Sequence, residues 1–381
     1  MSKIIIVGAG PMGCYTAQLL RKSGYQPILL EEHISVGKPI QCAGIVSTKL
    51  ISLVQNSVSK DSIINQINEF FIQASRIGTF EISIPKIASI IDREKFDASL
   101  GKDLDIRLGQ TVSRIEKDEN AYVIHTNQEK IFTADILIGA DGPDSIVRNF
   151  LLSQYDKDNH NHSFKLNYYF GMQYQIRLND DNQMFSKDRV NVFFTDDIPF
   201  FIWVIPENNQ VLRIGVISKH NKKILDRFIS EEKIHGEIID VITGKIPIGW
   251  IPTSYQNIAL VGDAACQIKP LTGGGLSYGL QSAQILVDCI NRGEIGQYDQ
   301  RWKNLFGKEI RFGLKAREIY ESLNREQRDR VFHLFKKNAH FIEQMIDFDH
   351  HSTLFLEAFK NPQVLLDAGK LLGYYLRDML K

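Results

Sequence analysis

One segment of this chain joins a carboxylate to a glycine-rich turn and a helix start, which together can bind hydroxyls and a flat ring. The apolar run 258–261 ends in Gly262-Asp263, and the triplet 273–275 leads into an apolar helical pattern. Asp263 can accept hydrogen bonds from a ribityl chain. Glycines let the backbone approach a ring, and the helix start supplies N–H groups and a positive dipole end, where a reduced flavin is negative. The segment predicts a flavin site at Gly262, Asp263, Gly274, Gly275 and Leu276.

A second glycine pattern, at the N-terminus, is typical of dinucleotide binding. The apolar run 4–7 precedes the G-x-G-x-x-G turn 8–13, and an amphipathic helical pattern follows. The glycines suit a tight turn, close approach to a pyrophosphate and close packing of helix on strand. The next apolar run, 28–30, ends in Glu31, near the spacing of an acid that binds a ribose hydroxyl. The adjacent Glu32 could compete for this role, but strand alternation favours Glu31. We expect the dinucleotide to contact Gly8, Gly10, Pro11, Met12, Gly13 and Glu31.

Two further segments fit the same domain. Residues 134–142 form another apolar run that ends in a carboxylate-glycine turn, Asp141-Gly142, before a helical pattern with Arg148. Residues 91–97 fit a helix start, from which Arg93 could reach a phosphate or the flavin. Together these strands and turns predict a Rossmann-like domain.

Composition argues against several classes of function. The 381 residues are enough for a large core, and the basic and acidic residues, 45 of each, give no sign of a nucleic-acid partner. The four cysteines are too far apart for a disulfide framework or a zinc site, which favours a reducing cytoplasm. No apolar run reaches the roughly 18 residues that span a bilayer, so we expect a cytoplasmic protein, at most peripheral at the membrane. We expect the pairs His160/His162 and His350/His351 in solvated loops, with no metal bound.

The middle of the chain changes period. From about Phe164 to Gly249, apolar and polar residues alternate in short runs separated by turns, which is typical of half-buried strands and favours an antiparallel sheet. The clearest strands are 170–178, 190–194, 200–205 and 211–216. Beyond Gly296 the pattern is helical. One face of the first such helix carries Trp302, Leu305, Phe306, Ile310 and Gly313.

These motifs carry a resemblance. In chain order, GAGPMG with Glu31, IDREKFD, GADGPDSIVR and GDAACQIKPLTGGG resemble the FAD-dependent oxidoreductases of the para-hydroxybenzoate hydroxylase fold. Within that group, the P-x-TGGG ending and QCAGIV at 41–46 are most similar to the geranylgeranyl reductase family. The resemblance implies an α/β fold with a Rossmann-like FAD-binding domain in two parts, 1–163 and 250–294. An antiparallel-sheet substrate domain would occupy 164–249, and a helical C-terminal region 295–381.

The resemblance also suggests roles for a loop and a strand. It brings Cys42, Ala43 and Gly44 to the flavin, with Arg93 and Val112 as further FAD contacts. Cys42 is the candidate catalytic residue, as a proton donor for which ordered water is the alternative. A lone cysteine of this kind is, however, more often a small buried hydrophobe than a reactive thiol.

In the proline-bounded run 199–206, Phe201 and Trp203 would form the substrate pocket, unless they are only core aromatics of a strand. Tyrosine is usual in the family where this chain has Phe201, so a hydroxyl that could orient or protonate the substrate is missing.

The function implied is the saturation of isolated C=C bonds of geranylgeranyl chains, most simply on archaeal-type glycerophospholipids, with hydride from N5 of reduced FAD. NADPH or a ferredoxin-like protein would reduce the flavin, and the apolar last helix could touch the membrane or dock on the body. One alternative is an FAD-dependent monooxygenase on a small aromatic or apolar substrate. Another is a flavin-binding protein without turnover.

Overall fold

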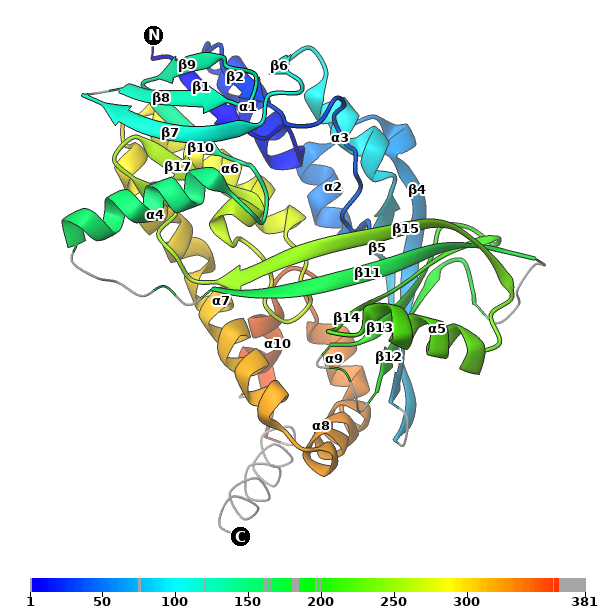
Figure 1. The fold of residues 1–381 in the computed structure, drawn as a ribbon. Helices are drawn as coiled ribbons and strands as arrows, with labels where there is room; N and C mark the ends of the chain where they lie inside the picture. The colour runs from blue at the N-terminus through cyan, green and yellow to red at the C-terminus, as the bar shows by residue number, and fades with distance from the viewer. Residues whose placement is uncertain are drawn as a thin grey trace.

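A six-stranded sheet forms the first layer of the molecule (Figure 1). The computed structural model describes residues 2–74, 77–119, 121–159, 164, 166–179, 185–195, 198, 200–358 and 360–362. In the order β16-β17-β10-β1-β2-β6, the strands of this sheet are parallel except for β16. Their bounds are β1 (Ile4–Val7), β2 (Ile28–Leu30), β6 (Asp105–Arg107), β10 (Ile136–Gly139), β16 (Ser254–Tyr255) and β17 (Ile258–Leu260).

Both faces of this sheet are covered, which explains why its strands are continuously apolar. Ile4 and Ile6 of β1 pack towards helices on one face, whereas Ile5 and Val7 pack towards a helix and a small three-stranded sheet on the other. The first face carries α1 (Pro11–Lys22), α3 (Arg93–Gly101) and α6 (Leu276–Asn291), and the second carries α4 (Ile146–Asn159), β7 (Val112–Asp118), β8 (Ala121–Thr126) and β9 (Ile131–Ala134).

An eight-stranded sheet forms the second layer, in the order β15-β11-β14-β13-β12-β4-β5-β3. It contains β3 (Ile45–Ser47), β4 (Ile63–Ala74), β5 (Gly78–Ile91), β11 (Leu166–Leu178), β12 (Arg189–Phe194), β13 (Ile202–Pro206), β14 (Val211–Ile217) and β15 (Gly236–Gly249). The sequence places strands at the positions of β11 to β14, and the structure confirms them.

The boundary drawn for the substrate domain needs correction. Residues 45–91, assigned from sequence to the FAD-binding part, contribute β3, β4 and β5 to the second sheet, and β12 pairs with β4 in parallel, so the sheet is not wholly antiparallel. Pairing between segments more than a hundred residues apart leaves no local signal in the sequence, because periodicity reports the faces of a strand and not its neighbour.

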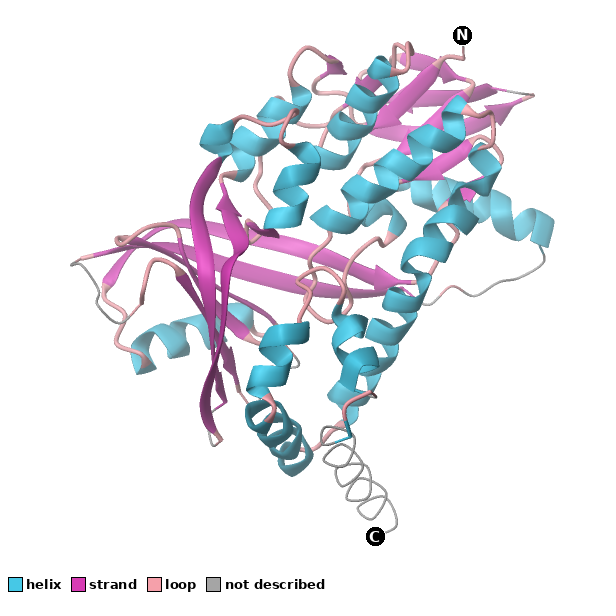
Figure 2. Cartoon of the chain, turned by 180° about the vertical axis from the view of Figure 1, so that it is seen from behind, coloured by secondary structure: helices cyan, strands magenta, loops and turns pink. Residues whose placement is uncertain are grey.

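Helices of the C-terminal region cross from the first sheet to the second (Figure 2). They are α7 (Tyr298–Ser322), α8 (Arg325–Lys337), α9 (Ala339–Met345) and α10 (His351–Ala358), and the remaining elements are α2 (Thr48–Val54), α5 (Asn221–Glu231) and the 3₁₀ turns η1 (Lys60–Ser62), η2 (Gly262–Ala265) and η3 (Ile295–Gln297). The predicted face of α7 is buried except for Leu305, which is 57% exposed. No helix in the described part of the chain combines the length and apolar character needed to cross a membrane. The apolar last helix expected after residue 363 and the pair His160/His162 lie outside the described residues.

Helix α7 holds the loop that precedes α6. Gly313 faces Pro270 so closely that an added Cβ would lie 2.9 Å from the proline Cδ. One turn later, Arg317 donates from Nε to Pro270 O (3.2 Å) and from Nη2 to Leu271 O (2.6 Å), with its guanidinium 3.5 Å from the centre of the Phe200 ring. The glycine-rich loop is therefore fixed by the C-terminal region.

We expect Gly313→Val to lower the free energy of unfolding by about 1–3 kcal/mol, because the new side chain must displace Pro270 in a packed contact. Urea unfolding measures this. Gly296→Ala is the control, because a Cβ at Gly296 meets nothing within 4 Å, and it should change stability by less than about 0.5 kcal/mol. Equal stability of the two variants would contradict the close contact.

Candidate active site

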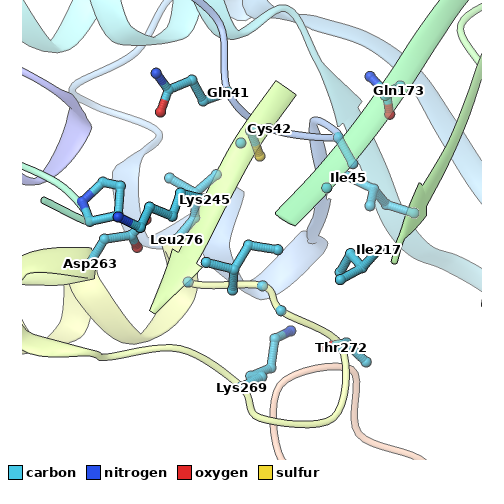
Figure 3. A pocket seen from close by; sticks show the side chains of 18 of the residues that line it. Gln41, Cys42, Ile45, Gln173, Ile217, Lys245, Asp263, Lys269, Thr272 and Leu276 are labelled. Atoms are coloured by element: carbon cyan, nitrogen blue, oxygen red, sulfur yellow. The ribbon is translucent and has the colours of Figure 1, made fainter. Parts of the chain in front are cut away.

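A cavity of about 1810 Å³ lies between the two sheets and the C-terminal helices. It starts at the carboxyl ends of β1 and β2, passes the loop before α6, and continues between the second sheet and helices α7 and α8. Figure 3 shows its middle part, where Cys42, Gln173, Lys245, Asp263 and Lys269 come from distant parts of the chain. All the residues singled out from sequence as site residues line it except Gly13, Gly44 and Gly262.

The turn after β1 has the packing that a dinucleotide needs. A Cβ at Gly13 would overlap Gly8 O, so only glycine lets α1 start so close to β1. A Cβ at Gly10 would meet nothing within 4 Å, which leaves open space before the N-terminus of α1. Helix α1 begins with Pro11, and its orphan N–H groups point towards that space.

Glu31 is buried directly after β2 and accepts a hydrogen bond from the glycine turn that follows β1. Its Oε2 accepts from Ala9 N (2.7 Å), and its Oε1 accepts from His33 N (3.0 Å) and lies 2.7 Å from His33 Nδ1. A carboxylate has room for about four hydrogen bonds, so one more donor, such as a ribose hydroxyl, can be accommodated. The side chain of Glu32 is 60% exposed, in keeping with the choice of Glu31.

Asp263 lies in η2 at the centre of the cavity. Burial raises the pKa of its carboxyl to about 6, although the nearby Arg93 and Arg148 act in the opposite direction. A Cβ at Gly275 would be 3.1 Å from Asp263 Oδ1, so the start of α6 and this carboxylate are adjacent. Cys266 is buried and has φ +56°, a left-handed backbone conformation that glycine adopts most readily.

Arg148 ties three segments together beneath Asp263. Its Nη2 donates to Pro143 O (2.6 Å) and to Tyr168 Oη (2.9 Å), and its Nη1 lies within 3.5 Å of Asp263 O and Ala264 O. Its side chain is almost completely buried. The sequence placed Arg148 after a glycine turn but gave no sign of this role.

Arg93 and Cys42 interact with each other at the wall of the cavity. Arg93 forms a paired contact with Asp97 (Nε–Oδ1 3.1 Å, Nη2–Oδ2 2.8 Å) and also interacts with the Cys42 thiol. Arg93 is thus held by this chain's own carboxylate while it lines the cavity. Cys42 is half-buried, accepts from Gly44 N (3.3 Å) and faces the cavity (Figure 3).

The loop 267–275 carries a buried ion pair that sequence reasoning missed. Lys269 Nζ donates to Phe348 O (2.9 Å) and to Asp349 Oδ1 (3.2 Å), and Ser47 Oγ donates to Asp349 Oδ2 (2.6 Å). Burial lowers the pKa of Lys269, against the pull of Asp349. The pair joins loop 267–275 to the segment before α10. Sequence patterns could not predict it, because they do not relate positions 80 residues apart.

His351 is not in a solvated loop, contrary to expectation, whereas His350 precedes α10 in a loop with its side chain 39% exposed. His351 begins α10 and lines the cavity, where burial lowers the pKa of its imidazole to about 4, so it is neutral at pH 7. His350 lies 3.6 Å from Asp347, whose carboxylate raises the pKa of the imidazole.

One row of residues across the second sheet forms the wall opposite the glycine loop. In register from β15 to β4, the row is Ile242, Gln173, Gly215, Trp203, Val192 and Ile72. A Cβ at Gly215 would overlap the Trp203 ring, so the indole lies flat over the glycine. Phe201 packs at the edge of the indole, with ring centres 6.3 Å apart. Both aromatics line the cavity, as expected for a pocket wall rather than a sealed core.

The residues fit FAD. The open turn at Gly10 and the start of α1 suit the pyrophosphate, Glu31 suits the adenosine ribose, and Val112 lines the cavity beside them. Asp263 suits the ribityl chain. Leu276 at the start of α6 and Cys42 both line the middle of the cavity (Figure 3), together with Gly274, Gly275 and Ala43, and the start of α6 suits the flavin ring.

Comparison with known proteins agrees with this geometry. A family model described as pyridine nucleotide-disulphide oxidoreductase matches residues 5–174. An uncharacterized protein of Methanocaldococcus jannaschii is 31% identical over 99% of this chain and 98% of its own length. The digeranylgeranylglycerophospholipid reductase of Methanococcus vannielii is 27% identical over 84% of this chain and 87% of its own.

The fold has a solved counterpart. A geranylgeranyl bacteriochlorophyll reductase-like protein of Thermoplasma acidophilum superposes with a TM-score of 0.75 over 97% of this chain and 99% of its own, at 21% identity. The tetracycline destructase Tet(51) shares the fold with a TM-score of 0.62 at 18% identity. From its relatives and from the flavin cradle that its own residues build, the chain belongs to the geranylgeranyl reductase family of FAD-dependent oxidoreductases.

Proposed function

We propose that this protein saturates isolated C=C bonds of geranylgeranyl chains on archaeal-type glycerophospholipids. The observation that carries the proposal is the continuation of the cavity away from the flavin end, between the second sheet and helices α7 and α8. This part is lined by Ile72, Ile82, Phe194, Phe201, Phe312, Leu323, Val331, Phe332 and Phe335. A long hydrocarbon chain gains free energy by burial against such a lining, and relatives of this chain are named for such a lipid.

An isolated alkene has no carbonyl to polarise, so the protein must act through positioning. Bound and reduced, FAD would supply the hydride. Trp203, fixed over Gly215, would hold the double bond, and its ring face would stabilise positive charge that develops on the substituted carbon. The dry aromatic wall would exclude bulk water from the reacting carbons.

The proton comes from Cys42 or from ordered water in this proposal. Cys42 faces the cavity beside Arg93. We also propose that NADPH or a ferredoxin-like protein reduces the flavin. A peripheral contact of the protein with the membrane that holds the lipid is a further part of the proposal.

The test is anaerobic. The bound flavin is reduced with light, digeranylgeranylglyceryl phospholipid is added, and flavin reoxidation is followed together with the mass of the lipid. The proposal predicts reoxidation in step with hydrogen gained by the lipid. Reoxidation only on admission of air, with the lipid unchanged, would refute it and indicate a monooxygenase.

Glu31→Ala should weaken FAD retention by about tenfold or more, because the ribose loses a charge-assisted hydrogen bond worth about 1.5–3 kcal/mol. Flavin content after gel filtration and the dissociation constant of FAD for the apoprotein measure the effect. Glu32→Ala is the matched control, because its carboxylate is largely exposed, and it should retain FAD. The assignment would be wrong if the two variants lost FAD equally or if Glu31→Ala kept full occupancy.

Trp203→Ala should keep FAD and slow lipid-dependent flavin reoxidation by about ten- to a hundredfold, because the double bond loses its positioning surface. Stopped-flow absorbance of the flavin follows this rate. Trp250→Ala removes an indole that packs on α7 outside the cavity, so its rate should stay within about twofold of the parent. An unchanged rate in Trp203→Ala would show that Trp203 only packs in the cavity wall and does not position the substrate.

A further inference from the structure

Gln173 lines the cavity and carries a buried hydrogen-bond donor that nothing in the described part of the chain satisfies. It lies on β11 beside Gly215, is 2% exposed and lines the cavity wall near Cys42, Ile45 and Ile217 (Figure 3). Its Oε1 accepts from Trp203 Nε1 (2.8 Å), whereas its Nε2 has no partner among the described residues.

The orientation of this amide follows from chemistry. The indole N–H is only a donor, so the amide oxygen must face Trp203 and the amide nitrogen must face the other way. Gly215 makes the pair possible, because the indole crosses above it to reach from β13 to β11. Trp203 and Gln173 therefore form one unit, with the indole N–H polarising the amide and strengthening its free N–H as a donor.

A buried N–H without an acceptor is costly, and native proteins leave few of them. The neighbours of Gln173 in the row offer no acceptor, because Ile242, Val192 and Ile72 are hydrocarbon and Gly215 has no side chain. A prenyl chain offers none either. The acceptor must therefore belong to a molecule bound in the cavity: the flavin, the polar head of the lipid or a small polar molecule beside the hydrocarbon.

We propose that Gln173 Nε2 holds a water molecule beside Trp203 and that this water protonates the alkene; the inference rests on the proposed function. The alkene gains a hydride on one carbon, which the reduced flavin supplies, and a proton on the other as an O–H bond of the water breaks. The hydroxide that remains keeps its hydrogen bond from Nε2 until a proton from bulk solvent restores water. A donor aimed at developing negative charge lowers the barrier to such a step. This assigns the proton to water and leaves Cys42 a contact of the flavin.

Three variants separate the roles. Gln173→Leu removes both hydrogen bonds at similar volume. Trp203→Phe removes the indole N–H but leaves the amide of Gln173 its own N–H. Asn191→Leu is the control, because Asn191 is also buried with an unpartnered amide nitrogen, yet it alternates with the cavity-lining Val190 and Val192 and does not itself line the cavity.

The first measurement needs no turnover. Tryptophan emission of the holoprotein should shift in Gln173→Leu, since an indole hydrogen bond is lost, and stay unchanged in Asn191→Leu.

The second measurement is flavin reoxidation by digeranylgeranylglyceryl phospholipid in H₂O and D₂O, with deuterium located in the product. Gln173→Leu should react about tenfold or more slowly, with a larger solvent isotope effect and less stereospecific deuterium, while Asn191→Leu matches the parent.

Two results would overturn the inference. One is a parent-like rate in Gln173→Leu. The other is a slow rate with the parent's isotope effect and stereospecificity, shared with Trp203→Phe, which would make Gln173 only a support for the indole. If the parent protein leaves the lipid unreduced, the proposed function fails and the role of the water fails with it. If the parent protein reduces the lipid and Gln173→Leu reduces it equally fast, the proposed function stands and only the role of the water is refuted.

Discussion

The buried guanidinium of Arg148 is the interaction on which the flavin end of the cavity depends. It binds the carbonyl of the loop after β10, the hydroxyl of Tyr168 on β11 and the carbonyls of η2. The two sheets and the segment that carries Asp263 are thus joined by one side chain. Carbonyl groups left without a donor at such a place would each cost about 1–3 kcal/mol. The position of Asp263, and of the start of α6 beside it, follows from this junction.

Helix α7 likewise uses a buried arginine to bind backbone carbonyls, here those of the loop that precedes α6. Arg317 donates to the carbonyls of Pro270 and Leu271, and Lys269 reaches in the opposite direction to Asp349 before α10. The loop that would face the flavin ring therefore has its backbone held by one charged residue and its own side chain anchored by another. A rigid loop of this kind suits a reaction that relies on the placement of two reactants.

The sequence predicted the elements whose signals are local. The strand-glycine-helix units around Gly8, Asp141 and Asp263 follow from short-range patterns, and so does β13, which carries Trp203 and directly follows Phe201. Contacts made across the fold could not be predicted in that way. The pairing of β12 with β4, the ion pair of Lys269 and the bond between Gln173 and Trp203 each join residues 30 or more positions apart. Leu305 shows the limit of periodicity itself, because it fits the helical pattern yet lies in solvent.

The place of β4 in the second sheet also bears on how the chain folds. Strands β4 and β5 leave the ribosome early and can pair at once as a hairpin, whereas β12, which completes β4, follows more than a hundred residues later. During synthesis one side of β4 is therefore an open strand edge, a kind of surface on which aggregation can start. A nascent chain of this protein depends on protection at that edge, by a chaperone or by its own first layer, until the distant strand arrives.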